Sequence, residues 1–165
     1  MPEAAFRRIG LVLLFAVAVV FANMARSQDD QRPRLLFIVE SDSRLPVVKA
    51  LLAGAEAELG AEFTTRSEIY VEYLDLLRFN DPAQLDLIRG FLVKRYGGLG
   101  LDAVAVLGTN ALSFVIDNRD EIAPGAPIVF GGLGEVGLQT ALAGRTPPDL
   151  SGVISPFDIQ GTLDL

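Results

Sequence analysis

The sequence predicts an α/β domain with a three-layer, doubly wound, mostly parallel sheet of five strands. Three observations predict it. Short apolar runs of strand length recur from residue 35 to residue 154, segments with apolar residues at helical spacing separate them, and Gly, Pro and polar residues mark the boundaries. Strands that alternate with amphipathic helices form a mostly parallel sheet with right-handed crossovers and helices on both faces.

Two kinds of strand pattern occur. Continuous apolar runs such as LLFIV and AVAVL are typical of strands buried on both faces of a parallel sheet. Another segment alternates: Ile69, Val71 and Tyr73 share one side, and the opposite side, which includes Glu72, is expected to face water near a sheet edge. The expected strands cover residues 35–39, 68–75, 103–107, 127–130 and 152–154.

The helical segments carry recognisable start and stop residues. Pro46 suits a first helical turn and Gly60 a C-terminal stop. Asp81, followed by Pro82 and Gln84, is typical of a capped helix start. The expected helices cover residues 46–59, 82–96, 109–116 and 135–143, with a further helix beginning at Gln160.

Composition excludes several classes of function. Of 165 residues, 50% are hydrophobic and the mean hydropathy is +0.38, which excludes a disordered chain. The chain has no Cys and no His, so it lacks Ser-His-Asp and Cys-His catalytic systems, Cys/His zinc sites and disulfides. Its net charge of −7 disfavours nucleic acid as a partner. We therefore predict no catalytic residue, metal ligand or cofactor.

The N-terminus has the pattern of an export signal. Arg7 and Arg8 precede an uninterrupted apolar run from residue 9 to residue 22, after which polar residues take over. The run is shorter than the roughly 20 residues that span a bilayer comfortably. Residues 1–27 are thus expected to be a signal peptide or an uncleaved membrane anchor, residues 28–33 a linker, and residues 34–165 the folded domain. A buried N-terminal helix of a cytosolic protein is the alternative interpretation.

Candidate ligand-binding residues follow the strands, because open parallel sheets bind ligands beyond the carboxyl ends of their strands. Thr109 and Asn110 open a helix, where free N–H groups favour an anion such as a carboxylate, although each can also serve only as a helix cap. The other candidates also have purely structural interpretations. The serines and the aspartate at residues 41–43 can be plain turn residues, the glycines at 131 and 132 can permit a tight turn, and Phe157 can fill the core. The predicted ligand-binding residues are Ser41, Asp42, Ser43, Thr109, Asn110, Gly131, Gly132 and Phe157.

A glycine motif competes with this interpretation. Residues 132–137 read GLGEVG, which matches the G-x-G-x-x-G fingerprint of dinucleotide-binding proteins. The motif follows the fourth strand instead of the first, and Asp149 and Asp158 lie in loop-like surroundings instead of ending a following strand. A phosphorylation receiver domain shares the same alternation of elements, but the sequence reads Leu-Gly-Thr at residues 107–109, where that domain needs an aspartate.

Several ordered segments resemble a known family. They are residues 67–79 (SEIYVEYLDLLRF), 91–98 (FLVKRYGG), 101–115 (LDAVAVLGTNALSFV), 119–132 (RDEIAPGAPIVFGG) and 150–165 (LSGVISPFDIQGTLDL). Residues 34–165 as a whole resemble the N-terminal lobe of the ABC-transporter substrate-binding-protein-like family. Within that family, they resemble most the periplasmic sensor region of hybrid sensor histidine kinases.

The resemblance implies a type I periplasmic binding fold, in which two α/β lobes close on a small solute such as an amino acid or a carboxylate. It also implies a location in the periplasm, or in the inner membrane facing the periplasm, and a second lobe that these 165 residues do not contain. We therefore expect a non-enzymatic, truncated solute-binding or sensing lobe of a transporter or a two-component system. An exposed lobe face is expected to permit self-association.

Two other classes of protein stay open at this point. One is an exported enzyme on a related α/β scaffold, against which the absence of His and Cys speaks. The other is an inactive remnant that binds no ligand.

Overall fold

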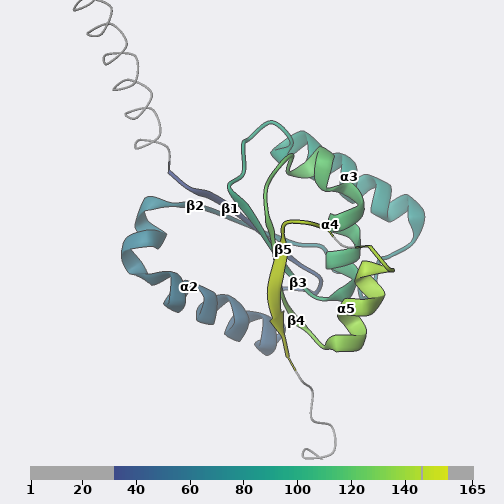
Figure 1. Ribbon diagram of the computed structural model, residues 1–165, viewed down its shortest axis with the longest axis horizontal. Helices are drawn as coiled ribbons and strands as arrows, with labels where there is room; N and C mark the ends of the chain where they lie inside the picture. Colours follow the sequence, from purple (N-terminus) through teal and green to yellow (C-terminus); the bar gives the residue numbers. More distant parts are fainter. Residues whose placement is uncertain (1–31, 146, 156–165) are drawn as a thin grey trace, which may run out of the picture. The chain divides into compact units, whose positions relative to one another are not determined.

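The computed structural model describes residues 32–145 and 147–155. Strands and helices alternate along this part of the chain (Figure 1). In order, they are β1 (Arg34–Val39), α2 (Pro46–Arg66), β2 (Glu68–Tyr73), α3 (Pro82–Tyr96), β3 (Ala103–Leu107), α4 (Thr109–Ile122), β4 (Ile128–Leu133), α5 (Glu135–Leu142) and β5 (Leu150–Ile154).

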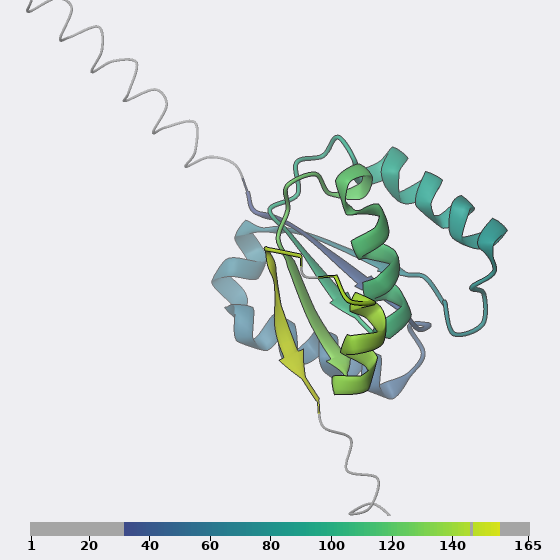
Figure 2. The same cartoon turned by 45° about the vertical axis from the view of Figure 1, so that its right-hand side comes forward.

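The five strands form one sheet in the order β2-β1-β3-β4-β5, and every neighbouring pair is parallel. Helix α2 lies on one side of the sheet, and α3, α4 and α5 lie on the other (Figures 1 and 2). The predicted α/β class and five-stranded parallel sheet are thus confirmed. The strand order reverses direction between β1 and β3, which in doubly wound sheets opens a crevice at the carboxyl ends of the strands.

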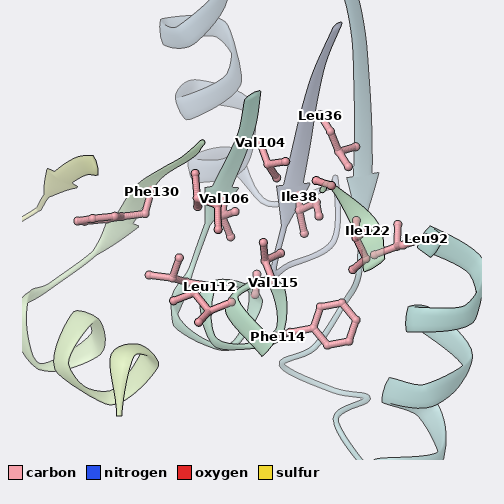
Figure 3. Close-up of a cluster of buried hydrophobic side chains, with 14 of the residues drawn as sticks. Leu36, Ile38, Leu92, Val104, Val106, Leu112, Phe114, Val115, Ile122 and Phe130 are labelled. Atoms are coloured by element: carbon pink, nitrogen blue, oxygen red, sulfur yellow. The ribbon is translucent and has the colours of Figure 1, made fainter. Parts of the chain in front are cut away.

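The main core lies between the sheet and the three-helix side. Leu36 and Ile38 of β1 and Val104 and Val106 of β3 are completely buried. They face α4, from which Leu112, Val115 and other apolar side chains project toward the sheet (Figure 3). Burial of an aliphatic side chain contributes about 1.5–3 kcal/mol, so this layer is the main source of stability.

Local signals placed most elements well. The Asp81 carboxylate accepts hydrogen bonds from the Ala83 and Gln84 backbone N–H groups, as the cap pattern before α3 predicted. In α2, Gly60 breaks the helical backbone with φ +77°, but helical turns resume and continue to Arg66. The first helical segment of α2 therefore ends at Gly60, as predicted, and the second helical segment that continues to Arg66 was not predicted.

The faces of β2 are the reverse of those predicted. Tyr70 packs toward the main core, and Glu72, on the same face, accepts a hydrogen bond of 2.5 Å from the buried Tyr96 hydroxyl. Val71 and Tyr73, on the α2 side, are 37% and 40% exposed. The carboxylates are tolerated on the inner face because other segments of the chain supply partners for them, among them Arg95 at 3.1 Å from Glu72. The edge position of β2 is confirmed.

The N-terminal apolar helix, the signal or anchor at residues 1–27 and most of the 28–33 linker lie outside the described residues, as do Phe157 and the helix expected from Gln160. None of the helices within residues 32–145 and 147–155 is long and apolar enough to cross a bilayer.

Candidate functional site

The carboxyl end of β1 reaches the point where the strand order reverses, and Glu40 is the first residue beyond it. The Glu40 backbone ties this rim of the sheet together. Its N–H donates to the Leu107 carbonyl at 2.9 Å, and its carbonyl accepts from the Leu76 N–H at 2.8 Å. Glu40 is only 8% exposed. Among the residues that the structure describes, it is the one charged residue that is buried.

The Glu40 carboxylate caps helix α4. Its Oε1 accepts a hydrogen bond of 3.2 Å from the Asn110 backbone N–H and a second one from the Asn110 side-chain amide. Gly108, the residue before the helix, has no side chain with which to cap it, and it has φ +106°. A Cβ at Gly108 would lie 2.0 Å from the Glu40 Oε2, so only glycine leaves room for this carboxylate.

This arrangement changes what the start of α4 can bind. The sequence predicted a ligand carboxylate at the N–H groups of Thr109 and Asn110, where the helix dipole favours an anion. In the structure, the chain's own Glu40 accepts the Asn110 N–H. An anion that approached this helix start would be repelled by the Glu40 carboxylate, so the anion site predicted from the sequence is already taken by the chain's own side chain.

Asp42, another predicted site residue, joins two loops of the rim. Its carboxylate pairs with Arg44 at 2.8 Å and with Arg78, from the loop after β2, at 3.0 Å. The hydrogen bonds from the Arg44 side chain and backbone, together with the charge of Arg78, lower the pKa of Asp42 to about 2. Asp42 is therefore ionised at physiological pH and is engaged in holding the loops. Of its neighbours, Ser41 is half-buried and Ser43 is exposed.

Thr109 is placed against helix α5. A Cβ at Gly137 would lie 2.5 Å from the Thr109 Oγ1, so Gly137 allows α5 to approach α4 closely. This packing gives the last glycine of the G-x-G-x-x-G motif a structural role. In the same motif, Gly132 has φ +68° and Gly134 precedes the first turn of α5.

The two glycines predicted in a ligand-binding loop lie inside a strand. Strand β4 continues through Gly131 and Gly132 to Leu133, so the prediction of a glycine-rich loop directly after Phe130 was wrong. In this extension, Gly131 pairs with Leu107 of β3, and a register irregularity between β4 and β5 pairs Phe130 with Gly152 and Leu133 with Ile154. The glycines still lie at the carboxyl end of the sheet, next to Leu107 and Gly108.

A cleft of about 290 Å³ lies beside the rim, between α3 and α4. This volume is at the lower end of the range for small-molecule sites. Of the predicted residues, only Asn110 lines it. Neither this cleft nor a role for Glu40 was predicted from the sequence. An acidic residue directly after a buried apolar strand was the available signal for Glu40, whereas the cleft depends on how two helices pack.

The described rim carries hydroxyl, amide and carboxylate groups, which suit ligand binding by hydrogen bonds and charge. Within residues 32–145 and 147–155, no group of three or more acidic residues is arranged to hold a metal ion. Comparisons with family models, curated proteins and solved structures found no match for this chain.

Proposed function

We propose that this chain is a non-enzymatic solute-binding or sensing lobe that contributes the carboxyl-end rim of its sheet to a ligand site. The observation that carries the proposal is the buried Glu40 at the reversal point of the sheet, held by Asn110. A carboxylate fixed in position before a ligand arrives loses little conformational freedom on binding. The exposed hydroxyl of Ser43 extends the same rim.

The solute class that fits this rim best is a small amino acid or a related compound. An ammonium group can be paired with the Glu40 carboxylate, and a hydroxyl or carboxylate can be bound by the serine hydroxyls. A single rim contacts only one side of a ligand, whereas small-molecule sites enclose most of the ligand surface. The proposed lobe therefore works with a second lobe that closes over it, as the resemblance to periplasmic binding proteins implies.

The binding part of the proposal is tested with the full chain by a thermal-shift screen of amino acids and small carboxylates, followed by calorimetry on any hit. We expect a rise in Tm for at least one amino acid, and weaker binding of that compound by Ser43→Ala. The matched control is Ser151→Ala, which removes an exposed hydroxyl in β5, at the opposite edge of the sheet from β2. A flat screen would support an inactive remnant instead.

The proposed location is the periplasm, or the inner membrane with the domain facing the periplasm. It is supported by the basic residues Arg7 and Arg8 and the apolar run that follows them. A fusion of a periplasm-dependent reporter enzyme after Ser155 should be active in cells. Deletion of residues 2–27 should abolish that activity, and activity retained after the deletion would contradict the location.

A further inference from the structure

We propose that the cleft between α3 and α4 is a separate binding site for a small ligand that carries a protonated amine on an apolar body. The cleft and the rim described above share Asn110. The inference does not rest on the proposed function, because the cleft residues are on the helical side of the sheet and their chemistry is considered by itself.

The floor of the cleft is apolar. Leu76 and Phe114 line it and are 1% and 7% exposed, and Leu85 at the start of α3 packs against the same core. Figure 3 shows the Phe114 ring extending from α4 on the side where α3 lies. Small-molecule sites combine apolar side chains with polar groups that orient the ligand. An apolar or aromatic ligand body would contact these apolar side chains, and polar and charged side chains form the rest of the lining.

The amide groups of the wall are oriented by their bonds within the protein. Asn110 donates its side-chain N–H to Glu40, and Asn118 donates its own to the Phe114 carbonyl at 2.7 Å. A carboxylate and a backbone carbonyl only accept hydrogen bonds, so the bonded atom of each amide is its nitrogen. The other polar atom of each side chain is an oxygen, which accepts, and each amide nitrogen keeps one further N–H. Both asparagines line the cleft, so each brings an acceptor oxygen to its lining.

The charges around the cleft also favour a cationic ligand. The one cationic residue of the lining, Arg89, is already engaged, with Glu121 at 3.1 Å and Asp86 at 3.6 Å. The second acidic residue of the lining, Asp117, pairs with Arg145. Three carboxylates therefore face two guanidinium groups, and the chain as a whole carries −7. This potential attracts a cation and repels an anion.

The asparagine oxygens and the negative potential together favour an ammonium group, which has three donors and no acceptor. An alcohol on the same apolar body would keep the apolar contacts and lose the charge, and a carboxylate would add repulsion. The order of affinity expected for matched compounds is amine, then alcohol, then carboxylate.

The test uses three probes with a common phenyl-ethyl body: phenethylamine, 2-phenylethanol and 3-phenylpropionate. Each is titrated into the full chain, and binding is followed by the amide resonances of Ser113 and Asn118 in two-dimensional NMR. We expect these resonances to shift most strongly and at the lowest concentration with phenethylamine. Equal affinity for the three probes, or no shift at millimolar concentration, would overturn the proposal.

Two variants and a control locate the effect. Asp86→Asn should weaken phenethylamine binding roughly two- to fivefold, the range expected for an exposed charge pair, and leave 2-phenylethanol unchanged. Asp120→Asn makes the same charge change on an exposed α4 residue that does not line the cleft, and it should have no effect. Ser113→Leu fills the cleft and should abolish binding. The circular dichroism spectrum of Ser113→Leu shows whether that variant folds. The test with Asp86→Asn does not depend on that result.

The rim and the cleft are distinguished by one further variant. Ser43→Ala should weaken a solute bound at the rim and leave phenethylamine binding in the cleft unchanged. If it weakens phenethylamine as strongly as Asp86→Asn does, the amine binds at the rim and the cleft proposal is wrong.

Discussion

Glu40 at the end of β1 and Asn110 at the start of α4 are joined by two hydrogen bonds that both end on the Glu40 Oε1. The contact spans 70 residues of sequence and lies where the strand order of the sheet reverses. It satisfies a backbone N–H at the helix start and places a negative charge at the positive end of the helix dipole. The chain thus uses a side chain from another element for a task that a local cap performs in α3.

Asn110→Ala should lower the free energy of unfolding by about 1–3 kcal/mol, because it removes the hydrogen bond from the side-chain amide to a buried carboxylate. Urea denaturation at neutral pH measures the loss. Asn80→Ala, which truncates an exposed asparagine, is the matched control and should change stability little. In a double-mutant cycle with Glu40→Gln, the two losses should be less than additive, since each variant weakens the same contact. Strict additivity would contradict this account.

Gly108→Ala should be among the most damaging single-methyl additions in the chain. The backbone at φ +106° and ψ 159° costs a residue with a Cβ about 1–3 kcal/mol. The overlap with the Glu40 side chain adds to that cost. Gly90→Ala in α3 is the control: a Cβ there meets nothing within 4 Å, so it should raise stability by about 0.5–1 kcal/mol. Equal effects of the two substitutions on the urea midpoint would show that the absence of a Cβ at Gly108 is not needed for stability.

The elements with strong local signals were predicted nearly to the residue. The expected strand at residues 103–107 is β3, and the cap at Asp81 begins α3 as expected. In these segments the apolar pattern and the turn residues agree with the tertiary environment, so local reasoning is sufficient. The candidate residues after β1 and β3 also lie at the carboxyl end of the sheet, because parallel strands fix that placement.

The errors arose where distant residues decide the outcome. The inner face of β2 carries Glu72, and nothing in the alternating pattern shows that Tyr96 donates a hydrogen bond to it and that Arg95 pairs with its charge. In the same way, the pairing of Asp42 with Arg78 joins loops 36 residues apart. Gly131 was assigned to a loop because the extension of β4 depends on its pairing with neighbouring strands. Sequence periodicity reports the environment of a segment and not the identity of its partners.

Asp149→Asn should reduce stability at neutral pH and have progressively less effect in acid. In the folded protein, the Asp149 carboxylate accepts hydrogen bonds from Arg119, and this lowers the pKa of Asp149 below its ordinary value. A carboxyl group with a lowered pKa stabilises the fold above the pKa of the unfolded chain, near 3.9, and this contribution is lost as the pH falls further. The difference in Tm between the wild type and the variant should therefore shrink below about pH 4.

The control for this comparison is Asp120→Asn, which removes a charge beside Arg119 in sequence but leaves its hydrogen bonds to Asp149 intact. Its effect on Tm should be smaller at neutral pH and should change little on acidification. A Tm difference for Asp149→Asn that stays constant from neutral pH to pH 3 would contradict the importance of the ion pair.

Tyr96 should resist ionisation as long as the protein stays folded. Burial raises the pKa of the Tyr96 phenol first, and its hydrogen bond to the Glu72 carboxylate raises it further. Of the three tyrosines in the chain, fewer than three should therefore contribute phenolate absorbance in the folded protein at about pH 11, where a tyrosine with an ordinary pKa near 10 is mostly ionised. All three should contribute after denaturation.

Tyr96→Phe tests how much the hydrogen bond between Tyr96 and Glu72 contributes to the free energy of unfolding. A phenol with a raised pKa stabilises the fold below the unfolded pKa of about 10, and this contribution is lost as the pH rises through the folded value. The variant should lose about 0.5–1.5 kcal/mol of unfolding free energy at neutral pH, because the hydrogen bond to Glu72 disappears, and it should then tolerate alkali better than the wild type. Tyr73→Phe, at a ring that is 40% exposed, should change neither quantity appreciably. Unchanged stability of Tyr96→Phe at both pH values would show that the buried hydroxyl does not stabilise the contact between α3 and β2.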